Sequence, residues 1–412
     1  MNRGDTNRRL NAICWTETIE EIRNIRPGCS LEAAVARKSA GRGLRRIEDP
    51  WPTCFCYFKN NVNVLQSRCE TIVDVAADWR EPDHPPREDA VAETLEAPNR
   101  WTEEALDYAL NRWMQRLTLE ALTDWMDPIA PDDPMSVGVV HGASDPLSGL
   151  RDAVAVWASG HSYLGHLPEA SPALLPAFAD AVQARGEDVQ AEFVDEAFLF
   201  NQASAVMAQP DRDERDAVRE QCDDHNIPED RRLLRPTRLV VAVLDGHESD
   251  DARGGIAEDV LLYEGGGHRR LPILWAPTDL SPDSYLEAMA RFRGVFPAHP
   301  DTPGALQMQK AFLEARDEPR AFAEGLEFLM SRGAPEVPSP NGHIRWSEYD
   351  DLDEVDNWIQ DQGEVLYAVV ARAPLHDQLP EGWPLRTPGG LHIPPLDDEE
   401  GREIANFVRS LS

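Results

Sequence analysis

The stretch Ser136-Val-Gly-Val-Val-His-Gly-Ala-Ser-Asp-Pro-Leu-Ser-Gly149 decides the fold class, because a short apolar run leads through small residues toward a helix. The pattern predicts a buried strand from Ser136 to His141, a helix from Leu147 to Ser159 and a second strand from Tyr163 to Leu167. Short apolar runs that alternate with helices are typical of a parallel sheet covered on both faces. We therefore expect an α/β protein.

The same alternation continues on both sides of this stretch. The pattern predicts helices at Trp101 to Leu119, Leu119 to Trp125 and Pro172 to Arg185. Further strands are predicted at Glu192 to Phe200, Arg238 to Leu244, Glu258 to Tyr263, Pro272 to Ala276 and Val365 to Ala371. A chain of 412 residues has room for two or three domains.

The charge of the chain excludes one class of partner. Acidic residues outnumber basic residues 74 to 40, which gives a net charge of −34. Binding to a phosphate backbone needs clustered lysines and arginines, so nucleic acid is not an expected partner. Only Lys38, Lys59 and Lys310 are lysines. An acid-rich, lysine-poor chain suits a salt-rich cytoplasm, because salt near 1 M shortens the Debye length to about 3 Å and screens the repulsion. We interpret the protein as halophilic, with a merely acidic protein as the alternative.

The sequence predicts no membrane anchor. No apolar stretch approaches the roughly 20 residues that span a bilayer. The first 30 residues lack the continuous hydrophobic region of a secretory signal. We therefore expect a cytoplasmic protein without a membrane span.

The N-terminal part of the chain differs in composition from the rest. Residues 1–60 contain eleven basic and seven acidic residues, and five of the six cysteines lie in residues 1–69. Cys54-Phe-Cys56 lacks the two-residue spacing and nearby histidines of a zinc site, so no metal site is predicted. We interpret residues 1–70 as an extension without packed structure or an upstream region translated from a misassigned gene start. A basic targeting arm is the alternative.

The segment Gly265-Gly-Gly-His-Arg-Arg270 is the most conspicuous candidate for binding chemistry. Its three glycines let backbone N–H groups approach a ligand, and its two arginines can bind a phosphate or a carboxylate. A flexible turn with solvated arginines is the alternative.

Four segments carry a resemblance to a known family, namely Val137 to Gly149, Ala158 to Leu167, Arg238 to Gly246 and Ile256 to Arg270. In them the chain resembles the acyl-CoA reductase family, of the fatty-acid reductase subunit type of bacterial luminescence, a branch of the aldehyde dehydrogenase superfamily. The resemblance implies two Rossmann-like three-layer αβα domains with parallel sheets. A cofactor-binding-type domain with N-terminal helices would span residues 71–240, and a catalytic-type domain with a C-terminal return segment would span residues 241–412.

The resemblance also implies an activity and its partners. Members of the family reduce a fatty acyl-thioester, such as an acyl-CoA, to the aldehyde with NADPH or NADH. The protein would act as a homo-oligomer or together with a related reductase subunit. The implied binding positions are His166, Asn201 and Gly246 for the cofactor, and Gly266, Gly267 and Arg269 for the substrate.

The implied catalytic positions carry substitutions. His268 stands where the family has its nucleophilic cysteine, and Ser144 stands where the superfamily has its oxyanion-hole asparagine. Phe200 falls where a small turn should let the backbone approach the pyrophosphate. Cys222 lies in an acidic stretch that we expect to be irregular, and nearby carboxylates should raise its pKa.

These substitutions leave three hypotheses for the function. The first is an acyl-CoA reductase with unusual site residues, in which His268 forms the acyl intermediate. The second is a catalytically inactive homologue that acts as a binding or partner protein, because fold does not imply function. The third is an acyl-transfer or thioester-hydrolysing protein with His268 as the base.

Overall fold

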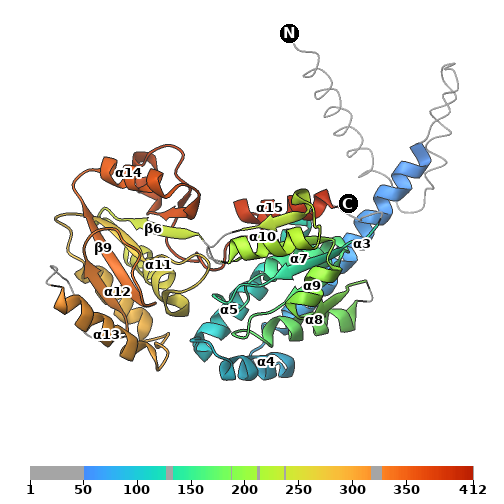
Figure 1. Ribbon diagram of the computed structural model, residues 1–412, viewed down its shortest axis with the longest axis horizontal. Helices are drawn as coiled ribbons and strands as arrows, with labels where there is room; N and C mark the ends of the chain where they lie inside the picture. Colours follow the sequence, from blue (N-terminus) through green and yellow to red (C-terminus); the bar gives the residue numbers. More distant parts are fainter. Residues whose placement is uncertain are drawn as a thin grey trace, which may run out of the picture. The chain divides into compact units, whose positions relative to one another are not determined.

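The computed structural model describes residues 51–126, 133–186, 188–210, 214–235, 238–316 and 327–411, with side chains from residue 64 onward except at 364. Both sheets lie within one compact unit, Tyr57–Ser412 (Figure 1). The expected extension over residues 1–70 lies outside the described residues as far as position 50.

The first sheet has five parallel strands in the order β3-β2-β1-β4-β5. They are β1 (Ser136–Val140), β2 (Ser162–His166), β3 (Ala191–Phe193), β4 (Ala205–Ala208) and β5 (Arg232–Leu234). The helices that connect them are α7 (Leu150–Ser159), α8 (Leu174–Arg185), α9 (Glu196–Gln202) and α10 (Arg215–Asp224). The strand order reverses between β1 and β4, which makes their carboxyl ends the place where such sheets bind ligands.

Two separate apolar cores show that helices cover both faces of this sheet. Val137 and Val139 pack with α7 and α8 on one face, while Val206 and Ala208 pack with α9 and α10 on the other. A strand that is buried on both faces needs a continuous apolar run. The apolar run of β1 therefore predicted this strand correctly. Every residue of α7 is buried, so this helix lies in the interior.

The second sheet has six parallel strands in the order β11-β10-β6-β7-β9-β8. They are β6 (Leu239–Val243), β7 (Ile273–Pro277), β8 (Leu329–Arg332), β9 (His343–Tyr349), β10 (Leu366–Val370) and β11 (Leu385–Arg386). The helices between them are α11 (Asp250–Leu261), α12 (Asp283–Arg293), α13 (Thr302–Ala315) and α14 (Leu352–Gln362). Alternate residues of β6 enter two cores, one with α11 and α12 and the other with α14. The expected three-layer αβα arrangement is therefore confirmed for both sheets.

Among the described residues before the first sheet, the helices are α3 (Trp51–Asp78), α4 (Pro85–Glu96), α5 (Glu103–Arg116) and α6 (Leu119–Met126). Leu65 and Cys69 on α3 are 3% and 0% exposed and belong to the core of the first sheet. Packed structure therefore begins before residue 71, whereas we expected an unpacked extension up to residue 70. The difference arises because buried apolar positions continue along α3 on the N-terminal side of residue 71.

Two predicted strands are helical. In the segment predicted as a strand from Glu192 to Phe200, only β3 is extended, because the Asp195 side chain accepts a hydrogen bond from the Phe198 N–H and begins α9. The segment Glu258 to Tyr263 lies at the end of α11 and in the turn after it. Ile256 and Val260 are buried at a spacing of four, which is the helical period.

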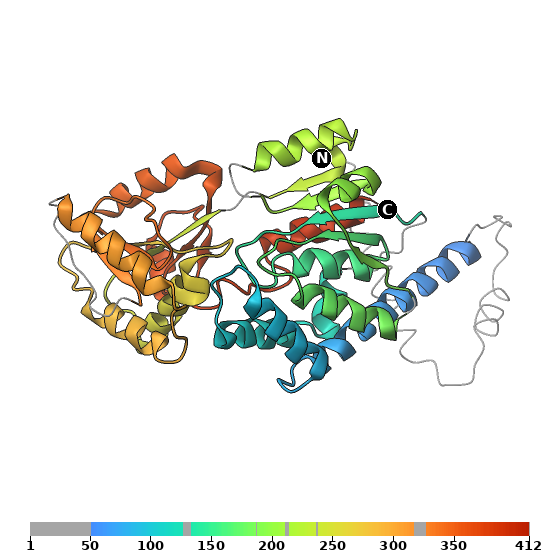
Figure 2. The same ribbon diagram turned by 60° about the horizontal axis from the view of Figure 1, so that its bottom comes forward.

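The C-terminal helix α15 (Glu399–Ser410) returns to the first sheet, where Ile404 and Val408 join the core that α7 lines. Figure 2 shows this helix, in red, among the green helices of that sheet. The expected boundary at residues 240 and 241 falls inside β6, which pairs with the second sheet. Within the described ranges, no helix combines the length and the apolar character needed to cross a bilayer.

Candidate functional site

The carboxyl ends of β1 and β4 define the candidate site, because the strand order reverses between them. After β1 the chain passes through Ser144 and Asp145 into α7, and after β4 it continues with Gln209. The loop that carries His268 and Arg269 reaches the same place, since the His268 N–H donates to Asp145 Oδ2 at 3.2 Å. Both sheets therefore contribute to the site.

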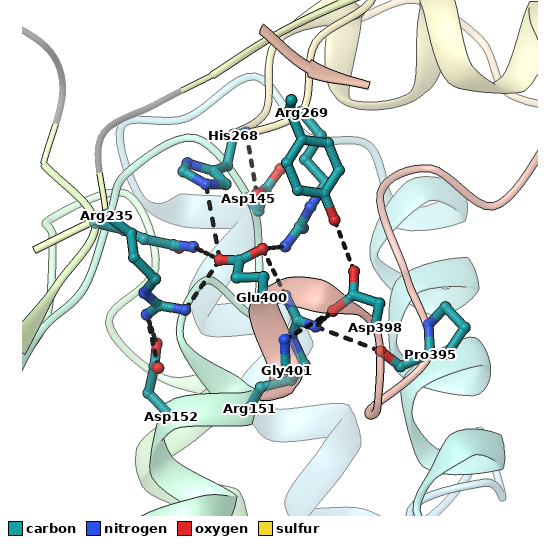
Figure 3. A network of polar contacts seen from close by, with 12 residues as sticks. Asp145, Arg151, Asp152, Arg235, His268, Arg269, Pro395, Asp398, Glu400 and Gly401 are labelled. Carbon is teal, nitrogen blue, oxygen red and sulfur yellow. Dashed lines mark hydrogen bonds and ion pairs between the residues drawn. The ribbon is translucent and has the colours of Figure 1, made fainter. Parts of the chain in front are cut away.

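A carboxylate of the chain itself lies at the centre of this site (Figure 3). Glu400 is 4% exposed and lies in the first turn of α15. Its Oε1 accepts hydrogen bonds from Gln209 Nε2 at 2.6 Å and from Arg235 Nη1 at 2.9 Å. Its Oε2 accepts from Arg151 Nη2 at 2.8 Å and from Arg269 Nη2. Both oxygens thus have two donors each.

The helix that carries Glu400 begins at a second buried carboxylate. Asp398 caps α15 by accepting from the Gly401 N–H at 2.8 Å, and it also accepts from Arg151 Nη1 at 2.7 Å. The Tyr367 hydroxyl donates to its other oxygen at 2.6 Å. This cap fixes the first turn of α15 in the crevice and thereby positions Glu400.

The electrostatic balance of the site keeps its acids ionised. Burial alone would raise the pKa of Glu400, but Arg269, Arg151 and Arg235 outweigh it and hold that pKa well below its usual range. Burial likewise opposes ionisation of Asp398, and Arg151 nevertheless holds its pKa below the usual value. Isolated buried charges are very costly, so this network is stable only with its full set of partners.

His268 lies beside this network as a buried, neutral side chain. It is 3% exposed, and its Nε2 is 3.9 Å from Glu400 Oε1. Burial lowers the pKa of His268 to about 3, although Glu400 opposes that shift. Burial also raises the pKa of Asp145, to about 6, against the opposing charge of Arg269. His268 therefore carries no proton to donate at neutral pH beyond its single neutral N–H.

The glycine-rich loop is tightly packed against its neighbours. Gly267 has φ +92°, and a Cβ at this position would lie 2.7 Å from Asp145 Oδ1 and 3.0 Å from His392 Nδ1. Only glycine fits such a conformation and such a close approach. Arg269 is 5% exposed and lies with its guanidinium carbon 5.1 Å from the centre of the Tyr367 ring. The alternative of a flexible turn with solvated arginines is therefore wrong for Arg269.

The crevice leaves little free space. Its cavity has a volume of about 30 Å³ and is lined by Asp145, Arg151, Gln209, Arg235, Arg269 and His392, among others. Sites for drug-sized ligands measure about 300–1,000 Å³. A dinucleotide does not fit the residues at this crevice as they stand, because Glu400 and the three arginines fill it.

The structure does not bring the implied cofactor residues together at this crevice. Asn201 lies exposed in the last turn of α9, and its side chain donates to the Ala197 carbonyl. His166 ends β2 with its Nδ1 3.2 Å from the Val194 carbonyl. Gly246 follows β6 in the second sheet and has φ +81°. Ser144 is half-buried in the turn after β1, next to Asp145.

The position expected to approach a pyrophosphate also differs. Phe200 is buried in α9, with its ring 5.9 Å from that of His225, whereas the next strand along the chain ends at Ala208. The residue that follows this strand end is Gln209, which donates to Glu400. Gln209, and not Phe200, therefore follows a strand of this sheet, because the run that contains Phe200 folds as α9.

The structure describes the side chains of two cysteines, and neither lines the cavity. Cys222 and Cys69 are both free and buried. Cys222 lies in the regular helix α10, so the expectation of an irregular stretch is wrong. Burial is the main cause that raises the pKa of Cys222, and Asp223 has a smaller effect in the same direction. Within the described part of the chain, no group of three or more His, Cys, Asp or Glu side chains is placed to hold a metal ion.

The residues that sequence reasoning missed are Arg151, Gln209, Arg235, Asp398 and Glu400. Asp398 and Glu400 lie in the run Asp397-Asp-Glu-Glu400, which looks like a solvated helix start. The three arginines that contact Glu400 are 131 to 249 positions away in the sequence. A faint signal was present, since Asp398 precedes a helical pattern as N-caps do.

No family model and no curated protein matches the sequence. Solved structures do resemble it. The chain is similar to an oxidoreductase from Marinobacter aquaeolei with a TM-score of 0.60 and 13% identity over 88% of this chain and 83% of that one. It is similar to lactaldehyde dehydrogenase with a TM-score of 0.58 and 10% identity over 78% of each chain.

A NAD-dependent benzaldehyde dehydrogenase from Corynebacterium glutamicum has a TM-score of 0.54 and 11% identity over 76% of this chain and 78% of its own. At such low identity these likenesses show the fold alone. The chain has the fold of aldehyde dehydrogenases.

Proposed function

We propose that this chain, which has the aldehyde dehydrogenase fold, is a catalytically inactive homologue and acts as a binding or partner protein for an acyl carrier or a related reductase subunit. The observation that carries this proposal is Glu400, whose buried carboxylate and three arginine partners fill the crevice where the fold offers its ligand site. The apolar cores that stabilise the fold are intact. The crevice, however, has little room for a substrate, and position 268 is a histidine without a thiol.

The chemistry of position 268 supports this proposal. A thiolate nucleophile is activated by a lowered pKa or by a neighbouring base, and it must be reachable by the substrate. His268 supplies no thiol and is 3% exposed. Ser144 has a shorter reach than an asparagine as a donor to an oxyanion. The acidic, lysine-poor composition supports a salt-rich cytoplasm as the place of action.

The competing proposal is an enzyme that reduces a fatty acyl-thioester, such as an acyl-CoA, to the aldehyde with NADPH or NADH. The likeness to a NAD-dependent benzaldehyde dehydrogenase favours this class. In this candidate His268 is unprotonated, since burial lowers its pKa to about 3. Its neutral imidazole attacks the thioester carbon, the carbon–sulfur bond breaks, and CoA leaves as its thiol with the imidazole N–H proton. The segment that carries Asp398 and Glu400 would first have to break its ion pairs with Arg151, Arg235 and Arg269.

Turnover of acyl-CoA separates these proposals. The full-length protein in molar KCl is mixed with long-chain acyl-CoA and NADPH or NADH, and both nucleotide oxidation and CoA release are measured. We expect neither signal above that of heat-denatured protein. Nucleotide oxidation that disappears in His268→Ala would establish the reductase and overturn our proposal. CoA release without nucleotide oxidation would instead identify a thioester hydrolase or acyltransferase.

A further inference from the structure

Three arginines from separate parts of the chain converge on one point in the crevice. Arg151 lies on α7, Arg235 directly follows β5 and Arg269 lies in the glycine-rich loop. Their side chains are 4–6% exposed, and all three contact the Glu400 carboxylate. Converging guanidinium groups are the arrangement with which proteins bind free carboxylates and phosphates.

The donors match both oxygens of a planar oxyanion. Arg235 and the Gln209 amide donate to one oxygen of Glu400, while Arg151 and Arg269 donate to the other. A carboxylate accepts about four hydrogen bonds, so the four donors saturate it. The geometry is that of a complete binding site with an occupant.

Contacts other than Glu400 hold the three arginines in place. Arg235 Nη2 lies 2.6 Å from both oxygens of Asp152, and Arg151 Nη1 lies 2.7 Å from Asp398 Oδ1. Arg269 lies over the Tyr367 ring. Because none of these contacts involves Glu400, the three arginines are held independently of it, as in a preorganised site. The cavity next to them, with a volume of about 30 Å³, adds room for an atom group larger than a carboxylate.

We propose that Arg151, Arg235, Arg269 and Gln209 form an oxyanion-binding site whose resident occupant is the side chain of Glu400. The first turn of α15 is thus an internal ligand of the crevice. An external carboxylate or phosphate group enters only where Glu400 is removed or withdrawn.

The test uses the full-length Glu400→Ala variant, in which the internal carboxylate is absent. Its Tm is followed by tryptophan fluorescence while potassium formate, acetate or phosphate replaces KCl at constant ionic strength. We expect a saturable rise in Tm of about 2–4 °C. A rise with formate and acetate assigns the site to planar carboxylates, a rise with phosphate assigns it to tetrahedral oxyanions, and either supports the proposal.

Matched controls separate this site from general salt effects. The wild type and Glu399→Ala, which removes an exposed glutamate from the same helical turn, should show no rise beyond that in KCl. Adding Arg269→Met to Glu400→Ala should abolish the rise. A folded Glu400→Ala protein that responds to none of the three anions would overturn the proposal.

A second measurement covers the case in which Glu400→Ala does not fold in KCl alone. In that case the same variant is refolded in formate, acetate or phosphate, and recovery of native fluorescence in any of them supports the site. Failure in all of them, while the volume-matched Glu400→Gln folds, would show that filled space and not an anion is what the crevice requires.

Discussion

The crevice around Glu400 and the exposed surface of α12 both contain arginines paired with carboxylates, but in different environments. In the crevice, Arg235 and Glu400 are 4% and 5% exposed and lie 2.9 Å apart. On α12, Arg291 and Glu287 are 60% and 75% exposed and lie 4.0 Å apart. Water solvates the surface pair whether or not it forms, whereas the buried groups have only each other. Burial, and not the number of ion pairs, therefore decides which charged residues contribute most to the stability of this protein.

The largest effect is expected from removing the central charge. Glu400→Gln leaves three buried arginines short of one anion, which should lower the free energy of unfolding by about 3–5 kcal/mol. Urea titration in molar KCl measures this change. Glu399→Gln serves as the matched control and should change the free energy by less than about 0.5 kcal/mol. Equal losses in the two variants would remove the distinction between the crevice and the surface.

A smaller loss is expected when one donor is removed. Arg269→Met should lower the free energy of unfolding by about 2 kcal/mol, because Glu400 loses one charged hydrogen bond but keeps Arg151 and Arg235 as partners. The same urea titration measures it. A loss as large as that in Glu400→Gln would mean that Arg269 alone holds the network together.

The pH dependence of stability sharpens the comparison further. The pKa of His268 falls from 6.5 to about 3 on burial. The contribution of the neutral imidazole to the free energy of unfolding is therefore fully present above pH 6.5 and is lost as the pH falls toward 3. Between pH 7 and pH 5 the free energy of unfolding of the wild type should fall by up to about 2 kcal/mol more than that of His268→Gln. Urea titrations at both pH values measure the difference, and equal losses would mean that the imidazole is solvated in the folded protein.

The smallest effect is expected at the surface pair. Glu287→Gln removes the partner of Arg291 and should change the free energy of unfolding by less than about 0.5 kcal/mol, because both groups are well solvated. A loss above 1 kcal/mol in this variant would contradict the assignment of the surface charges as energetically minor.

Much of the fold could be predicted from the sequence because its strands are buried on both faces. The apolar runs of β1, β6, β7 and β10 are continuous, and each was predicted. The prediction failed at α9, where Asp195 turns an apolar run into a helix. Short apolar segments do not distinguish strand from helix without such capping signals.

The site was predictable only on the side of the glycine-rich loop. The glycines drew attention to Arg269 as a residue that binds a carboxylate or phosphate, and in the structure it contacts the carboxylate of Glu400. Nothing local to Glu400 indicated burial, since it ends an acidic run and its partner Arg269 lies 131 positions earlier. Pairing over such distances depends on the tertiary fold, which periodicity and spacing do not encode.

Binding of NADPH and NADH to the full-length protein in molar KCl tests the central claim most directly, because it needs no assumption about the substrate. Ligand fluorescence is titrated against protein whose folded state is checked by its thermal transition. We expect no saturable binding at nucleotide concentrations up to about 1 mM, since Glu400 and its arginines occupy the crevice and leave a cavity of about 30 Å³. Saturable binding in the micromolar range by the wild type would contradict it and would favour the reductase.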